Sequence, residues 1–251
     1  MKSLGIIPAR YASTRFPGKP LADMGGQTMI QRVYEKTMQS RLDEVVVATD
    51  DDRIYEHVLA FGGRVVMTSS NLPSGTDRCA AVAEQKEFSA FDNIINVQGD
   101  EPFIRPEQID TVLATLETRP GCGIATLAKQ LDMPEELFNP NVVKVVFGKN
   151  NQALYFSRSP VPFVRGQSQN DWIGNATFYK HIGLYGYRRE VLLELAKLPI
   201  GALEKAESLE QLRWLENGYA IGIGITSFET RGIDTLEDLR LAMAEHQINA
   251  G

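Results

Sequence analysis

The feature that most restricts the fold is a regular alternation of short apolar runs with longer amphipathic stretches in the first half of the chain. Apolar runs of four or five residues that lack an outward polar alternation are typical of strands covered on both faces. The stretches between them have helical spacing. We therefore predict strands at 4–8, 45–49, 64–67 and 93–97, and helices near 27–38, up to about 60, at 76–87 and at 106–117.

This order predicts an α/β fold with a mainly parallel, Rossmann-like sheet that has helices on both faces. After about Gly121 the pattern changes, and we interpret the later runs as a sheet extension that contains a flexible polar insertion at 166–175. The runs are IATLA, VVKVVF, ALYF and HIGLYGY, followed by helices near 207–216 and 236–247. Without repeats or linkers, the chain is predicted to be one domain over 1–251, with halves of about 1–120 and 121–251.

Composition excludes several classes of function. The 251 residues carry a formal net charge of −6, which disfavours nonspecific binding to nucleic acid or to anionic membranes. Cys79 and Cys122 lack the spacing of a zinc site and are too few for a disulfide framework. We find neither a signal-peptide core nor an apolar run that could span a membrane. We therefore expect a cytoplasmic protein without nucleic-acid or membrane partners.

Three cations follow the first predicted strand. The segment IIPARYASTRFPGKPL contains Arg10, Arg15 and Lys19, and no acidic residue precedes Asp23. Ligands of open α/β sheets bind beyond the carboxyl ends of strands, and these cations suit polyphosphate oxygens. We predict a phosphate-binding loop, and a solvated basic surface loop is the alternative. The loop matches neither GxxxxGK[ST] nor GxGxxG, which disfavours Walker-type NTPases and classical NAD enzymes.

Acidic residues supply candidate metal ligands. Asp100 ends the strand-like segment NIINVQGD, where it is either a magnesium ligand beside bound phosphate or a turn residue. Asp234 precedes the last predicted helix, where it is a ligand or where it or Thr235 is the N-cap. The triplet 50–52 is similar to the DxD metal motif of glycosyltransferases, although Thr49 or Asp50 as an N-cap explains it equally well.

Five ordered segments carry a family resemblance. The segments ARYASTRFPGKPL, NVQGDEP, ALYFSR, YKHIGLYGY and ESLEQLRWLE together resemble the 3-deoxy-manno-octulosonate (Kdo) cytidylyltransferases, also called CMP-Kdo synthetases, from about residue 4 to 243. The related CMP-sialate synthetases have a first loop that reads more like ARGGSKGIPRKN. The resemblance implies a nucleotidyltransferase fold of the nucleotide-diphospho-sugar transferase type. Its first half binds the nucleotide, and its second half binds the sugar acid and forms a homodimer.

The resemblance also implies an activity. Kdo, or a close analogue such as 8-amino-Kdo, is activated with CTP to give the CMP-sugar and pyrophosphate for lipopolysaccharide biosynthesis. The expected chemistry is in-line attack of the anomeric hydroxyl on the α-phosphorus of CTP. Two rival hypotheses remain: a sugar-transferring enzyme that uses residues 50–52, and a catalytically silent nucleotide-binding regulator.

Site residues follow from the same resemblance. Arg10, Arg15 and Lys19 are expected to bind the triphosphate and to act with Asp100 in catalysis, and Asp100 and Asp234 to hold Mg²⁺. The sugar acid and its surroundings are expected to contact Gln98, Arg78, Arg158, His181, Tyr185, Glu210 and Gln211.

Each of these assignments has a plainer alternative. His181 and Tyr185 are typical core residues of an apolar strand, Arg78 is typical of an exposed helix position, and Glu210 has the spacing to pair with Arg213. The chain also departs from the family at Leu236, where proline is common. Proline there favours helix initiation but ligates nothing, so the metal assignment stands.

Overall fold

The computed structural model describes residues 1–12, 15–229 and 232–246. The chain forms two compact units, and each is described by itself. Unit 1 consists of residues 1–110 and the C-terminal segment from 230, and unit 2 consists of residues 111–229. Among the described residues, no helix has both the length and the apolar character needed to cross a lipid bilayer.

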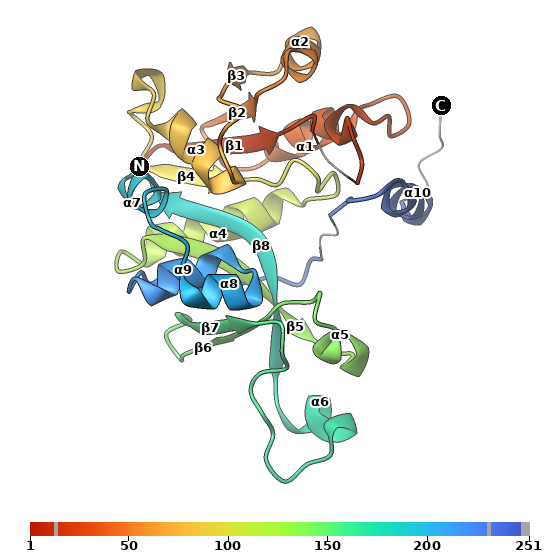
Figure 1. Ribbon diagram of the computed structural model, residues 1–251, viewed down its shortest axis with the longest axis vertical. Helices are drawn as coiled ribbons and strands as arrows, with labels where there is room; N and C mark the ends of the chain where they lie inside the picture. The colour runs from red at the N-terminus through yellow and green to blue at the C-terminus, as the bar shows by residue number, and fades with distance from the viewer. Residues whose placement is uncertain (13–14, 230–231, 247–251) are drawn as a thin grey trace. The chain divides into compact units, whose positions relative to one another are not determined.

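Unit 1 contains a parallel four-stranded sheet in the order β3-β2-β1-β4 (Figure 1). Its strands are β1 (Ser3–Ala9), β2 (Glu44–Thr49), β3 (Val65–Met67) and β4 (Asn93–Asn96). Its helices are η1 (Lys19–Leu21), α1 (Met29–Thr37), α2 (Asp52–Ala60), α3 (Gly75–Ala83), η2 (Lys86–Phe88), α10 (Leu236–Glu245) and the start of α4 (Pro106–Thr118). The parallel order confirms the prediction from the apolar runs.

Local sequence explains where these helices begin. Thr28 caps α1 by accepting a hydrogen bond from the backbone N–H of Gln31, and Ser74 forms a capping box with Asp77 at the start of α3. The helix predicted at 76–87 is shorter than expected. It ends at Ala83, and the separate 3-10 turn η2 follows it.

The C-terminal segment packs within unit 1, although we expected it to belong to the second half of the chain. Ile233 and the apolar face of α10 are buried against Phe16, Met24 and Met29, which follow the first strand. Burial of this apolar surface removes it from water and attaches the end of the chain to its beginning. Residues far apart in sequence are thereby brought to the same loop region.

Unit 2 contains a mixed sheet built around the long strand β8. Strand β5 pairs antiparallel with β8 and parallel with β9, while the β6–β7 hairpin pairs with β8 through β6. The strands are β5 (Ile124–Leu131), β6 (Lys144–Phe147), β7 (Ala153–Ser157), β8 (Phe178–Arg188) and β9 (Ile221–Ile225). Besides the end of α4, the helices are α5 (Pro134–Phe138), η3 (Gln169–Asp171), α6 (Trp172–Asn175), α7 (Arg189–Leu195), α8 (Ala202–Glu207) and α9 (Glu210–Glu216).

Two elements of unit 2 differ from the prediction. The helix expected at 207–216 is α9, and the helix α8 before it was not predicted; Ser208, in a left-handed conformation (φ 51°), separates the two. Strand β9, with the sequence IGIGI, was missed because alternating glycines weaken a strand signal. A Cβ at Gly224 would lie 2.9 Å from atoms of Thr111 and Thr115, so glycine lets α4 approach the strand.

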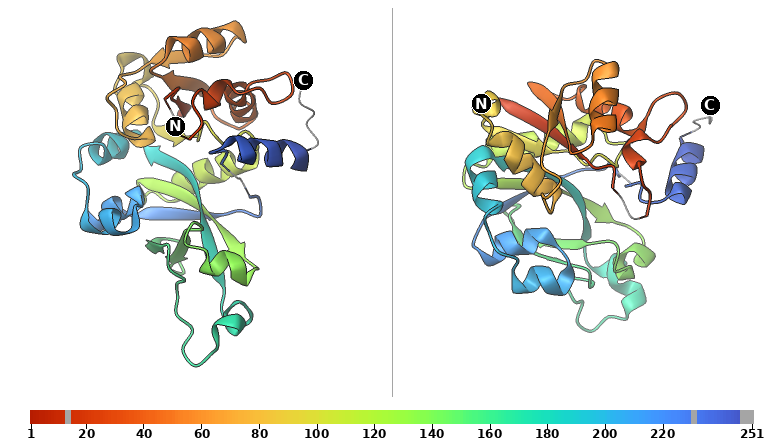
Figure 2. Two further views of the ribbon diagram at one scale, coloured as in Figure 1. Left: turned by 45° about the vertical axis from the view of Figure 1, so that its right-hand side comes forward. Right: turned by 45° about the horizontal axis from the view of Figure 1, so that its top comes forward.

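The polar insertion at 166–175 has a structured anchor. It contains η3 and α6, and Trp172 is almost fully buried, with its ring stacked on Phe178 at a centroid distance of 6.2 Å. Figure 2 shows this segment beyond the start of β8, and α7 follows the other end of that strand. The buried Trp172 therefore anchors the insertion, which we expected to be flexible, in a small aromatic cluster.

Candidate functional site

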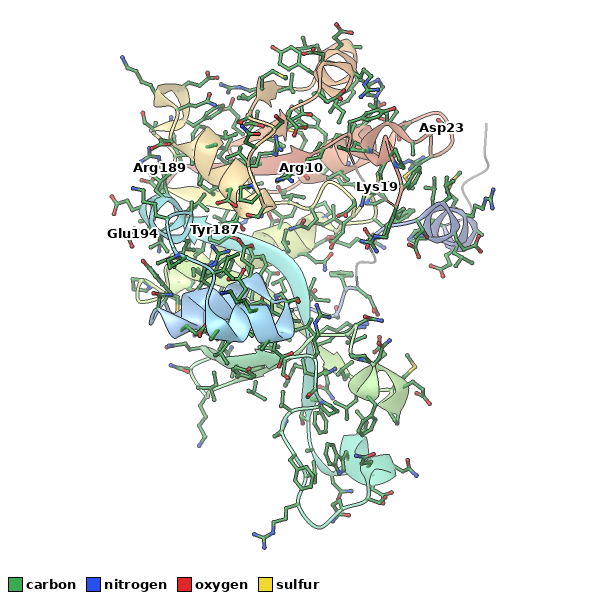
Figure 3. The ribbon with its side chains drawn as sticks, in the orientation of Figure 1. Arg10, Lys19, Asp23, Tyr187, Arg189 and Glu194 are labelled. Atoms are coloured by element: carbon green, nitrogen blue, oxygen red, sulfur yellow. The ribbon has the colours of Figure 1, made fainter. Side chains whose placement is uncertain are left out.

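The basic loop leaves the carboxyl end of β1, as the sequence predicts. Figure 3 shows Arg10 directly after this strand and Lys19 farther along the same loop. Gly18 precedes Lys19 with a φ of 72°, a left-handed conformation that glycine adopts without a steric penalty. Residues 13–14 of the loop lie outside the described residues.

Two distant aspartates converge on Lys19. Its Nζ lies 2.8 Å from Asp100 Oδ2 and 3.2 Å from Asp234 Oδ1, and Asp234 Oδ2 also lies 3.0 Å from Arg15 Nη2. Lys19 is 13% exposed, whereas Asp234 is 45% exposed. The structure thus brings together four of the predicted site residues as alternating positive and negative charges at the loop.

The position of Asp234 resolves the capping alternative. Thr235, not Asp234, caps α10, and it forms a capping box with Asp238. The Asp234 carboxylate is therefore used for the cations of the loop instead of the helix terminus. Similarly, Asp100 is more than a turn residue, because its carboxylate pairs with Lys19 and its carbonyl accepts a hydrogen bond from the Ile233 N–H at 2.9 Å.

A pocket of about 180 Å³ lies beside this cluster. Four of the predicted site residues, Arg10, Lys19, Gln98 and Asp100, line it. The other lining residues are Pro8, Ala9, Ala12, Pro20 and Gly99. Gly99 is required by packing, because a Cβ there would lie 2.5 Å from the carbonyl oxygen of Pro8. The two strand ends that carry Arg10 and Asp100 are thereby allowed to approach closely.

Arg10 and Arg78 lie near each other but differ in exposure. Arg10 donates hydrogen bonds to the carbonyls of Leu72 and Ser74, and burial followed by the nearby charge of Arg78 lowers its pKa. Arg78 is fully buried, not an exposed helix residue, and its Nη2 lies 2.9 Å from Asp50 Oδ2. Asp50 balances these cations electrostatically.

Two members of the acidic triplet 50–52, Asp50 and Asp51, are engaged within the protein. Asp50 pairs with Arg78, and Asp51, rather than Thr49 or Asp50, is the N-cap of α2. Asp51 also forms a bidentate pair with Arg53, with contacts of 2.9 and 2.7 Å. These partners disfavour the DxD metal interpretation.

A second group of predicted residues lies in unit 2, where Tyr185 is buried and His181 is half-buried. His181 Nε2 lies 2.9 Å from Thr126 Oγ1, and its ring contacts Phe156 edge-on at 5.0 Å. Desolvation lowers the pKa of His181 to about 3, so the imidazole is neutral. Tyr185 is buried against Trp214, and burial, together with the charge of Glu210, raises its pKa well above the usual value.

Helix α9 and its surroundings hold the remaining predicted residues. Glu210 Oε1 lies 3.1 Å from Arg213 Nη2, as its spacing predicted, while Gln211 is buried. The Nε2 atom of Gln211 has no hydrogen-bond partner within the described part of the chain. Arg158 is held by backbone carbonyls, among them those of Glu207 at 2.6 Å and Pro140 at 3.0 Å.

Comparison with known proteins identifies the family. Residues 4–225 match the cytidylyltransferase family. The chain belongs to the cytidylyltransferase family. It is 60% identical to the 3-deoxy-manno-octulosonate cytidylyltransferase of Parabacteroides distasonis over 97% of this chain and 98% of that protein. The protein of the same name from Bacteroides thetaiotaomicron is 58% identical, over 96% of this chain and 97% of its own length.

A solved structure agrees with these sequence matches. The cytidylyltransferase described here resembles CMP:2-keto-3-deoxy-manno-octonic acid synthetase complexed with CTP, with a TM-score of 0.91 and 42% identity. The match covers 98% of this chain and 99% of the other. The expected α/β nucleotidyltransferase fold is confirmed.

Several features of this cytidylyltransferase were missed by sequence reasoning. Gly99 has a packing role that a glycine before an aspartate only hints at. Thr126, which contacts His181, lies on a neighbouring strand and gave no local signal. The Asp50–Arg78 pair joins residues 28 positions apart, and only the folded chain reveals it.

Proposed function

We propose that this chain transfers the cytidylyl group of CTP to Kdo, or to a close analogue such as 8-amino-Kdo, for lipopolysaccharide biosynthesis. The observation that carries the proposal is the convergence of Asp100 and Asp234 on Lys19, which lines the pocket beyond β1 together with Asp100. The names of the relatives support the choice of nucleotide and sugar acid.

The reaction exchanges one phosphorus–oxygen bond for another. The anomeric hydroxyl oxygen of the sugar acid bonds to the α-phosphorus of CTP, the bond from that phosphorus to the bridging oxygen breaks, and pyrophosphate leaves. The hydroxyl proton passes to solvent. Arg10, Arg15 and Lys19 hold the β- and γ-phosphates and neutralise the charge that develops on the leaving group.

A magnesium ion belongs to the proposal. The donor set fits, because the Asp100 and Asp234 carboxylates already face one cationic group, and hard oxygen ligands suit this ion. No cluster of three or more metal-binding side chains occurs in the described parts of the chain, so phosphate oxygens and water would complete the coordination. When bound, the ion would polarise the α-phosphate and lower the pKa of the attacking hydroxyl.

Unit 2 is proposed to recognise the sugar acid. Neutral His181 and protonated Tyr185 offer hydrogen bonds to sugar hydroxyls, and the buried Gln211 amide has an unused donor among the described residues. Arg158 carries the positive charge that a sugar carboxylate requires, and the Glu210 carboxylate accepts hydrogen bonds from sugar hydroxyls. In unit 1, Gln98 is assigned by resemblance to the surroundings of the nucleotide and the sugar acid, and Arg78 to the sugar side.

A pyrophosphate-release assay tests the activity. CTP, Mg²⁺ and a panel of sugar acids are supplied, and we expect pyrophosphate only when both CTP and a Kdo-type acid are present. Sialic acid and omission of sugar are the controls. Binding of CTP without sugar-dependent release would favour the silent regulator, and transfer from a nucleotide sugar without pyrophosphate would favour the glycosyltransferase.

We extend the proposal to assembly and compartment. The family resemblance supports a homodimer, and the acidic composition is compatible with a cytoplasmic protein. Sedimentation velocity tests the assembly: a species of twice the chain mass is expected, and a monomer at micromolar concentration would contradict it.

A further inference from the structure

Arg53 occupies an unfavourable position for a cation. It is the second residue of α2, where the exposed backbone N–H groups give the helix terminus a partial positive charge. Asp51 compensates by accepting hydrogen bonds from Arg53 Nε at 2.9 Å and Nη2 at 2.7 Å. This bidentate contact, rather than burial, raises the pKa of Arg53 and fixes the plane of its guanidinium.

The guanidinium is stacked on the phosphate loop. Arg53 Cζ lies 3.3 Å from the centroid of the Tyr11 ring, a close cation–π contact. Tyr11 directly follows Arg10, one of the cations that line the pocket. The helix terminus after β2 is therefore connected to the loop after β1 through one aromatic ring.

Tyr11 also controls the other end of the loop. Its carbonyl accepts a hydrogen bond from the Gly18 N–H at 3.0 Å, and its ring covers Gly18 so closely that a Cβ there would lie 3.1 Å from the ring. Lys19 is the next residue. Tyr11 thus contacts, through its carbonyl and its ring, the residue that precedes Lys19, and it directly follows Arg10.

We propose that Arg53, anchored by Asp51, is a positioning residue that holds Tyr11 and so pre-organises Arg10 and Lys19 for the triphosphate of CTP. The inference rests on the proposed function. It gives the acidic triplet after β2 a role other than metal binding. Pre-organisation lowers the cost of ordering the loop in both the ground state and the transition state, so its loss raises KM and leaves kcat nearly unchanged.

The test compares CTP binding in paired variants. For R53M, calorimetry with CTP and Mg²⁺ should give a Kd about three- to tenfold weaker, and the KM for CTP should rise similarly while kcat and the sugar KM stay within about twofold. R53K, which keeps charge without the planar fork, should fall between R53M and wild type. R240M removes an exposed arginine paired with Glu237 on α10 and should change nothing.

Tyrosine variants separate positioning from simple charge loss. Y11F keeps the ring and should bind CTP like wild type, whereas Y11L should weaken CTP binding at least as much as R53M, because it removes the ring from both Arg53 and Gly18. The double variant R53M/Y11L should bind CTP no more weakly than Y11L, because both changes remove the same contact between Arg53 and Tyr11. Unchanged CTP affinity in R53M, or additive losses in the double variant, would overturn the inference. Failure of wild type to bind CTP would instead overturn the proposed function.

Discussion

The two groups of predicted site residues differ in their access to water. In unit 1, Arg15, Asp100 and Asp234 are 65%, 33% and 45% exposed, and with Lys19 they make two positive and two negative charges. In unit 2, half-buried His181 and buried Tyr185 contact aromatic rings, and desolvation lowers the pKa of the imidazole and raises that of the phenol, so both groups are neutral. The charged side chains around Lys19 can exchange partners, whereas His181 and Tyr185 are neutral hydrogen-bonding groups.

This difference matches two kinds of recognition. Hydrated ion pairs contribute little to stability, so their members can exchange partners when a polyphosphate arrives. Desolvation disfavours the charged forms of His181 and Tyr185, so the imidazole and the hydroxyl are presented in a constant protonation state. The comparison predicts that substitutions of the charged residues around Lys19 in unit 1 affect turnover and that substitutions of the predicted site residues in unit 2 affect pH-dependent stability or sugar affinity.

The largest effect is expected for Asp100→Asn. The amide keeps the shape of the side chain but loses its charge toward Lys19 and the proposed ion, so kcat should fall by at least about a hundredfold. The free energy of unfolding should change by less than about 1 kcal/mol, because the ion pair is partly exposed. Steady-state kinetics and urea denaturation measure the two quantities.

Asp92→Asn is the matched control for this variant. Asp92 accepts a hydrogen bond from the Lys2 N–H at an exposed position of the same unit and should have no effect on kcat. Near-normal turnover of Asp100→Asn at saturating Mg²⁺ would remove the catalytic role of Asp100 and with it the proposed contrast between the units.

An intermediate effect is expected from His181→Gln, on pH-dependent stability. Folded His181 has a pKa of about 3, below the ordinary value of about 6.5, so below pH 6.5 the unfolded chain binds a proton that the folded chain refuses. Stability is therefore lost as pH falls through this window. Between pH 7.5 and 5.0, wild type should lose about 2 kcal/mol more than the variant.

Chemical denaturation of both proteins at the two pH values provides the measurement. Subtraction cancels the titration of groups that the two proteins share, and glutamine retains a polar partner for Thr126. If the free energy of unfolding changed with pH equally in wild type and variant, the imidazole would be hydrated and the lowered pKa of His181 would be refuted.

Sequence reasoning performed best where local pattern and fold agree. The strands of unit 1 are apolar on both faces, so both faces of the sheet must be covered. Their runs alone therefore predicted the parallel sheet. Arg10 and Lys19 lie on one short loop, and their shared location followed directly. Convergence of Asp100 and Asp234 came only from family resemblance, because 134 positions separate them and tertiary packing of α10 brings them together.

The missed features depend on contacts that have no local signal. The glycines of β9 look unfavourable for a strand until α4 is packed against them. Helix α8 was missed because it is short and because no glycine or proline marks the left-handed Ser208 that separates it from α9. Trp172 was hidden in a polar stretch, although one large aromatic side chain is enough to anchor a short segment.

The smallest effect is expected for Glu210→Gln, and it tests the boundary between structure and recognition. Arg213 keeps its second partner, Glu204, at 2.9 Å, so the free energy of unfolding should change by less than about 0.5 kcal/mol. If Glu210 binds the sugar acid, the KM for that substrate should rise about five- to tenfold while the KM for CTP stays constant. Glu204→Gln removes the other Arg213 partner and is the matched control. Equal sugar KM values for both variants would assign Glu210 to the helix pair alone, whereas a selective rise would place sugar recognition in unit 2 and nucleotide binding in unit 1.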